Sequence, residues 1–214
     1  TTASNNTAVG QAALQVNTTG DSNVAVGWNA LTANTTGYYN NGIGRSALTA
    51  NTTGAHNIAL GSDALMANTT ANNNVAVGNY SLKASTTGNE NTAVGYNTLS
   101  LNVTGTHNTA IGRTALYSNT VSENTAVGAE ALQQNTTGVG NCALGRQALH
   151  NNTTATENSA MGLYALYANS TGSYNSAFGS RALLANTTGQ YNIAVGNDSL
   201  DANTTGSYNT ATGR

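Results

Sequence analysis

The sequence predicts an all-β protein, a parallel β-solenoid (β-roll) of about 12–13 coils with 17 residues per coil, in which residues 1–214 form a single repeat array. Three observations support this prediction. One sequence motif recurs every 17 residues, except for an interval of 16 between Gly112 and Gly128; it reads Asn-x-Ala-[Val/Ile/Leu]-Gly-x-x-Ala-Leu-x-x-Asn-Thr-Thr-Gly-x-x. A unit this short cannot hold the two packed helices of a helical repeat. Thr, Val and Ile favour extended structure, and Pro, which interrupts strand ladders, is absent.

The first element of each coil is predicted to be a strand. We number each coil from its first Asn, so that residues 6–10 are positions 1 to 5 of the first complete copy. Position 3 is Ala in every copy except Gly42. Side chains alternate along a strand, so positions 1, 3 and 5 point one way and positions 2 and 4 the other. An Ala column fits the narrow lumen that 17 residues enclose.

If Ala faces the lumen, the apolar side chains at position 4 form a stripe along the outside of the solenoid. Such a stripe is unusual on a monomer and suggests a covering partner. We therefore expect a lateral interface between copies of the chain at Val9, Val26, Ile43, Leu60, Val77, Val94, Ile111, Val127, Leu144, Met161, Phe178 and Val195. The alternative is that positions 2 and 4 face the lumen and Ala packs at a corner.

The next elements are a glycine corner and the main apolar filling. Gly at position 5 indicates a positive φ or a close backbone approach. Position 9 is Leu in all twelve complete copies, from Leu14 to Leu200, and is expected to fill the core beside the Ala at position 8. Stacked Asn side chains are expected to form amide ladders along the axis, as in cross-β structures.

The last element is the Asn-Thr-Thr-Gly turn at positions 12 to 15. It contains sequences that match N-glycosylation acceptors at Asn17, Asn34, Asn51, Asn68, Asn102, Asn135, Asn152, Asn169, Asn186 and Asn203. The alternative, which we favour, is that Asn and Gly supply turn geometry. Glycans about 4.8 Å apart would also crowd one another. The residue missing between Asn119 and Asn124 is expected to shorten this turn without breaking the array.

Composition excludes several functional classes. Charged residues make up 7% of the chain and the net charge is −2, so neither nucleic acid nor an anionic membrane is expected as a partner. The carboxylates are scattered and His56, His107 and His150 are expected on the surface, while the single Cys142 excludes an internal disulfide. We therefore expect no catalytic, cofactor-binding or metal-binding residues, and no enzyme.

Two surface columns remain as candidates for binding. Tyr174, Tyr191 and Tyr208 share position 17 and are expected to stack, either as plain packing between coils or as a glycan-binding ladder. Adjacent Thr side chains should diverge, which leaves one Thr per coil on a face and weakens an ice-binding interpretation.

The unit Asn91–Leu99, Asn-Thr-Ala-Val-Gly-Tyr-Asn-Thr-Leu, followed by the turn Asn102–Gly105, resembles two repeat families. One is the head region of trimeric autotransporter adhesins, whose shorter Ala-[Ile/Val]-Gly repeats wind as left-handed parallel β-rolls in a trimer. The other is the repeat shaft of bacteriophage tail-fibre and related appendage proteins. The resemblance implies a homotrimer on a cell surface or virion, with glycan or host-receptor binding through regions outside this chain.

The function expected from the sequence is a structural fibre or shaft segment of an extracellular or virion appendage, of the adhesin or tail-fibre type. Neither end carries a polar cap, which favours a segment of a longer fibre. The alternatives are a repetitive-surface binding module for glycan or ice, and an extracellular filament subunit that assembles end to end.

Overall fold

The computed structural model describes residues 2–214 as an all-β parallel β-solenoid of about 12 turns, each of about 17 residues. This confirms the predicted fold class. No described residue is helical, so residues 2–214 contain no helix that could cross a membrane. The chain divides into two compact units, residues 1–108 and residues 109–214, which are described separately below.

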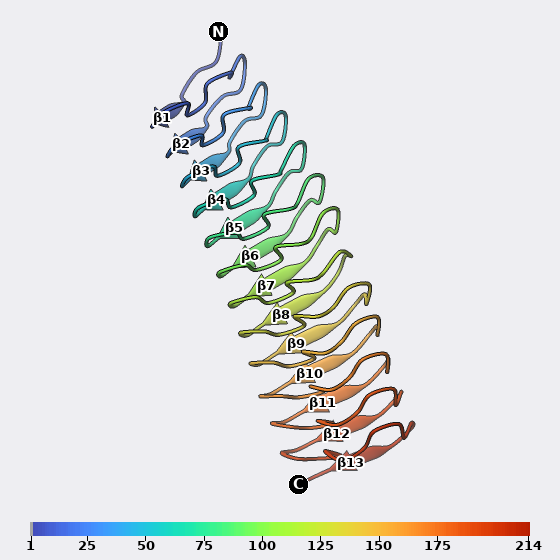
Figure 1. Cartoon of the computed structure of the whole chain (residues 1–214). Coiled ribbons are helices and arrows are strands. Elements are labelled where there is room, and N and C mark those ends of the chain that lie inside the picture. The colour runs from blue at the N-terminus through green and yellow to red at the C-terminus, as the bar shows by residue number, and fades with distance from the viewer. Residues whose placement is uncertain (1) are drawn as a thin grey trace. The chain divides into compact units, whose positions relative to one another are not determined.

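Each coil contributes one strand of three residues, and successive strands pair in parallel (Figure 1). The strands of the first unit are β1 Thr7–Val9, β2 Val24–Val26, β3 Asn41–Ile43, β4 Ile58–Leu60, β5 Val75–Val77 and β6 Thr92–Val94. Those of the second unit are β7 Thr109–Ile111, β8 Thr125–Val127, β9 Cys142–Leu144, β10 Ser159–Met161, β11 Ser176–Phe178, β12 Ile193–Val195 and β13 Thr210–Thr212. The strand thus occupies positions 2 to 4 only, and turns make up most of the coil.

The register of the strands places identical positions side by side. In the first unit Ala59 pairs with Ala76, and in the second unit Ala160 pairs with Ala177. Every position of the repeat therefore becomes a column along its unit, as the 17-residue period predicts.

The core consists of the Ala and Leu columns. In the coil that begins at Asn57, Ala59, Ala64 and Leu65 are all completely buried. The side chains of Ile58 and Leu60 on the same strand are exposed. Because Ala faces inward and positions 2 and 4 face outward, the first of the two predicted strand orientations is confirmed, and the alternative with Ala at a corner is wrong.

Gly at position 5 makes the predicted corner, for both of the expected reasons. Gly61 has a φ of +139°, and a Cβ on it would lie 2.6 Å from the carbonyl carbon of Gly78 in the next coil. Two consecutive turns follow, in which Ala47 N–H donates to the Gly44 carbonyl (3.3 Å) and Asn51 N–H donates to the Leu48 carbonyl (3.1 Å). The chain thereby reverses direction without a second strand.

Two Asn ladders hold the coils together, which confirms the predicted amide stacking. At position 1, the Asn40 Oδ1 accepts from the Asn57 backbone N–H (3.0 Å) and from the Asn57 Nδ2 (3.1 Å). At position 12, the Asn51 Nδ2 donates to the Asn34 Oδ1 (2.8 Å). Both columns also meet within a coil, because Asn40 Nδ2 and Asn51 Nδ2 each donate to the Gly54 carbonyl, at 2.7 and 3.0 Å.

The 16-residue coil keeps its ladders. Its shortened turn lets Asn119 Nδ2 donate to the Val121 carbonyl at 2.6 Å, where other coils use the residue at position 15. The Asn119 Oδ1 still accepts from Asn135 Nδ2 at 2.8 Å, and Thr120 Oγ1 still donates to the Thr136 carbonyl at 2.8 Å. The deletion is therefore absorbed within the turn, as expected.

Candidate interaction surfaces

The apolar stripe predicted at position 4 lies on the outside of each unit. Val26, Val77, Val94 and Val127 are half-buried, and the other eight members of the column are exposed, up to 58% for Val9. Ile58 and Ile193 at position 2 add exposed apolar surface to the same strand face. Each unit thus presents a continuous outward column of large apolar side chains, in the register that its parallel strands impose.

The ten candidate glycosylation asparagines lie in the position-12 ladder. The side chains of Asn34, Asn51, Asn68, Asn102, Asn135, Asn152, Asn169 and Asn186 are fully buried, whereas Asn17 and Asn203 are half-buried. An N-linked glycan would need the Nδ2 nitrogen, which Asn51 and Asn152 use for two hydrogen bonds each. The folded coil therefore has no room for a glycan at the eight buried positions.

The two Thr columns of the turn have different environments. At position 13 the Thr35 Oγ1 donates to the Thr52 carbonyl of the next coil at 3.1 Å, and Thr52 repeats this bond to Thr69 at 3.0 Å. At position 14, Thr36 and Thr53 are exposed, and among the described residues their hydroxyl groups have no protein partner. One Thr at position 14 faces solvent in every complete coil except the shortened one, where Val121 stands, as the divergence of adjacent side chains predicts.

The Tyr column at position 17 forms the predicted stack. The rings of Tyr174 and Tyr191 lie 4.9 Å apart with planes 4° from parallel, and those of Tyr191 and Tyr208 lie 5.0 Å apart at 7°. The same position pairs Tyr39 with His56 in the first unit, at 5.2 Å. Packing between coils accounts for these contacts.

Ionisable side chains of neighbouring coils form hydrogen bonds and ion pairs. The Glu130 carboxylate accepts from Gln147 Nε2 (2.5 Å) and from the Arg113 guanidinium, and His150 Nε2 lies 3.9 Å away. The hydrogen bond from Gln147, together with the charge of Arg113, lowers the pKa of Glu130 below its ordinary value. In residues 2–214 no three His, Cys, Asp or Glu side chains come close enough to hold a metal ion.

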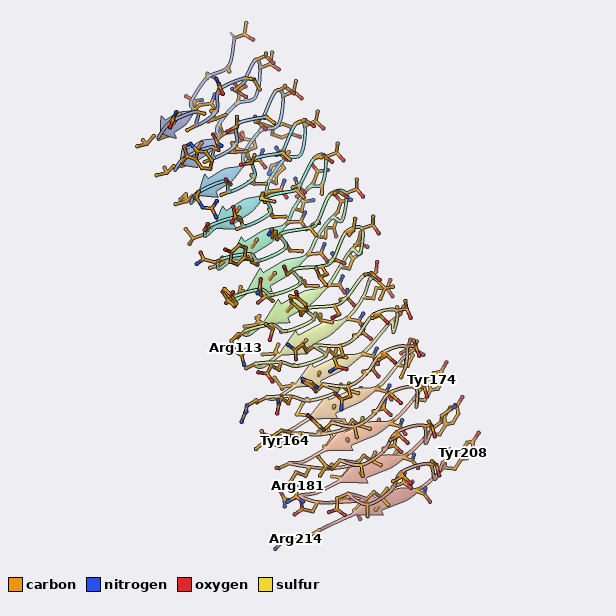
Figure 2. The ribbon with its side chains drawn as sticks, viewed as in Figure 1. Arg113, Tyr164, Tyr174, Arg181, Tyr208 and Arg214 are labelled. Carbon is orange, nitrogen blue, oxygen red and sulfur yellow. The ribbon has the colours of Figure 1, made fainter. Side chains whose placement is uncertain are left out.

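The structure also contains a groove that sequence reasoning missed. It lies in the second unit, has a volume of about 600 Å³, and is lined by Tyr164, Tyr167, Leu184, Gln147 and Arg181, with Ala168 and Ala185 at position 11. Tyr164 and Arg181 project from the opposite side of the coils to Tyr174 and Tyr208 (Figure 2). The signal in the sequence was the small residue at position 11 beside aromatic residues at positions 7 and 10.

Comparison of this chain with profiles of protein families, with curated proteins and with solved structures finds no match. The resemblance to adhesin heads and tail-fibre shafts therefore rests on the repeat pattern of the sequence alone.

Proposed function

We propose that this chain is a structural segment of an extracellular or virion appendage, of the adhesin or tail-fibre type, and that copies associate side by side through the strand column at position 4. The observation that carries the proposal is the division of each coil into a closed interior and an apolar outer strand face. The lumen is filled by Ala and Leu, and the buried amides are paired in ladders.

The interior ladders support a mechanical role. Backbone bonds of the strand, both Asn columns and the Thr column at position 13 join neighbouring coils, and this set recurs along each unit except where Ser85 replaces Asn and Val103 replaces Thr. Repeat proteins of this kind gain stability from every interface between neighbouring units. A load applied along such a stack is shared among many equivalent hydrogen bonds.

The outer column supports association between chains. Burying about 100 Å² of apolar surface yields on the order of 2.5 kcal/mol, so a column of side chains as exposed as Leu60 (45%) and Met161 (47%) can hold copies together. A parallel homotrimer is the arrangement favoured by the resemblance to trimeric adhesin heads. The low charge of the chain adds little repulsion between copies.

The test is the mass of the native particle in solution, measured by sedimentation and native mass spectrometry. A homotrimer has three times the chain mass of 21.6 kDa. A species of 21.6 kDa at micromolar concentration would overturn lateral association. Particles of many lengths that grow with concentration would favour the end-to-end filament instead.

A second candidate function, binding of a repetitive surface such as ice, is supported by the free hydroxyl groups at position 14. Thr36, Thr53 and their equivalents form one exposed column per unit. Thermal hysteresis and ice-shaping assays test this candidate. Activity that is retained in Thr53→Val and Thr70→Val and lost in Thr53→Lys would favour surface binding. Absence of activity in the parent chain would discard this candidate function.

A further inference from the structure

The groove in the second unit lies where large side chains at positions 7 and 10 stand beside Ala at position 11. The position-11 side chains are Gln134 and Asn151 in two successive coils, and Ala168 and Ala185 in the next two. The small alanine side chains leave a depression beside the large side chains of Tyr167 and Leu184. A volume of about 600 Å³ lies within the range of small-ligand sites.

The wall of the groove is aromatic. The Tyr164 and Tyr167 rings meet edge to face, with centroids 5.5 Å apart and planes at 79°. His150 of the preceding coil stacks on Tyr167, with ring centroids 5.3 Å apart; it is buried there, so the expected surface position of His150 is wrong. Ring faces carry partial negative charge, so they attract the weakly positive C–H groups on the face of a sugar ring.

Cations flank the aromatic wall. The Arg146 guanidinium lies over the Tyr164 ring at 5.8 Å, and within residues 2–214 no carboxylate lies within ion-pair distance of it. Arg181 lines the groove from the next coil and pairs with Asp198 at 3.3 Å. Guanidinium groups match carboxylates in shape and charge.

The surrounding charges also favour an anionic ligand. Four cations face this side of the second unit, Arg113, Arg146, Arg181 and Arg214, against the three carboxylates of Glu130, Asp198 and Asp201. The local balance is therefore positive, although the whole chain carries a net charge of −2.

We propose that this groove binds an acidic oligosaccharide two or three sugar units long. The apolar sugar face lies on Tyr164 and Tyr167, the sugar carboxylate pairs with Arg146 or Arg181, and the Gln147 amide oxygen accepts a sugar hydroxyl. Such a site goes beyond the structural role proposed above and does not depend on side-by-side association.

The test is calorimetric titration of the full chain with trigalacturonate, with a sialylated trisaccharide and with neutral maltotriose. We expect at least one acidic trisaccharide to bind at least tenfold more tightly than maltotriose, and its affinity to fall with added salt. Failure of both acidic sugars to bind, or equal binding of maltotriose, would overturn the proposal.

Variants locate the site. Tyr164→Ala should preserve the fold at position 7, because Ala12 occupies that position in another coil. Arg146→Ala should preserve it at position 6, because Ala129 occupies that position. Each is expected to weaken binding at least tenfold. Tyr174→Ala, on the opposite side of the coils, is the matched control and should bind as the parent does (Figure 2). Unchanged binding by both groove variants, or equal loss in the control, would contradict the assignment.

Discussion

At the scale of single residues, each coil depends on backbone conformations that most side chains avoid. Positions 7, 9 and 17 have positive φ, and the Leu at position 9 adopts +48° to +52° throughout. The left-handed region costs a residue other than Gly about 1–2 kcal/mol. Full burial of a Leu side chain contributes about 1.5–3 kcal/mol, which offsets that cost. The Leu column is therefore kept by packing, against its local preference.

Gly61 tests the corner at position 5. Gly61→Ala places a side chain at a φ of +139° and sets its Cβ 2.6 Å from the backbone of Gly78. We expect a loss of more than about 3 kcal/mol in the stability of the first unit, because backbone atoms cannot move aside. Thermal and urea unfolding followed by circular dichroism measure the loss.

Gly37→Ala is the matched comparison at position 15. Its added Cβ would lie 2.4 Å from both the Asn34 Oδ1 and the Gly54 carbonyl oxygen, but φ is not positive there, and Ala71 and Ala155 already occupy the equivalent position in other coils. The Asn68 Nδ2 adjusts there to 3.2 Å from the Ala71 carbonyl. We expect a loss of about 1 kcal/mol or less, as for a mild overpacking. Equal losses in the two variants would contradict this account of the corner.

Glu130 is expected to give the second unit a dependence on acid pH. Its folded pKa lies below the ordinary value because the carboxylate accepts from Gln147 and faces Arg113. The stabilisation is therefore fully present above the unfolded pKa and is lost as pH falls through the folded pKa. Melting temperatures measured from pH 7 down to pH 2.5 should fall less steeply in Glu130→Gln than in the parent chain.

The control for this titration is Glu157→Gln, which changes an exposed carboxylate on another column. It should follow the pH profile of the parent chain. A parent profile that is flat below pH 4.5, or one that Glu130→Gln reproduces in full, would contradict a role for Glu130.

At the scale of elements, the Asn ladders join neighbouring coils in addition to the three-residue strands. The position-12 ladder has one interruption in the first unit, where Ser85 replaces Asn. Its hydroxyl oxygen and the Asn68 Oδ1 are buried without a hydrogen-bond partner. Unpaired buried polar atoms of this kind cost about 1–3 kcal/mol each.

Ser85→Asn is expected to repair the ladder. The new Nδ2 can donate to the Asn68 Oδ1 and to the Gly88 carbonyl, as Asn51 Nδ2, two coils earlier, donates to the Asn34 Oδ1 and the Gly54 carbonyl. We expect a gain of about 1–2 kcal/mol, measured as a higher melting temperature and a higher urea midpoint. A lower melting temperature would show that the site cannot accept the amide.

The reverse substitution provides the control. Asn51→Ser removes the donor to the Asn34 Oδ1 and should destabilise the first unit by about 1–3 kcal/mol. If Ser85→Asn and Asn51→Ser changed stability in the same direction, the ladder could not be the cause.

At the scale of the whole molecule, the surface of each unit is divided among columns with different chemistry. The strand column is apolar, position 14 presents Thr hydroxyl groups, and the second unit has an aromatic and cationic groove opposite its Tyr stack. Because the interior repeats in every coil, differences in function must come from these outward columns.

Association through the strand column predicts the effect of making it polar. Thr212 already occupies position 4 in β13, so Leu144→Thr, Met161→Thr and Phe178→Thr should preserve the strands. We expect the triple variant to shift from trimer to monomer in sedimentation experiments, with the circular dichroism spectrum unchanged.

Tyr174→Asn with Tyr191→Asn, a residue that Asn73 already places at position 17, removes exposed apolar surface from another column and should leave the oligomeric state unchanged. A triple variant that stays a trimer would place the interface elsewhere.

The sequence by itself determined the coil length, the Ala and Leu columns, the glycine corner and the turn that absorbs the deletion. A strict period places identical residues in contact in any stacked arrangement, so these features follow from repetition and side-chain size. It also implied that large residues at position 4 would face outward once Ala filled the lumen.

Only the tertiary structure decided how the turns are arranged. In the three-residue strand, side chains alternate between the two faces. At positions 5 to 17, side-chain directions depend instead on turns that are closed by hydrogen bonds to the next coil. Those bonds place the Asn of the glycosylation sequences inside the coil and Leu in a left-handed conformation. They also bring Tyr164, Tyr167 and Arg181 together, because the groove is formed by neighbouring coils and no single repeat contains it.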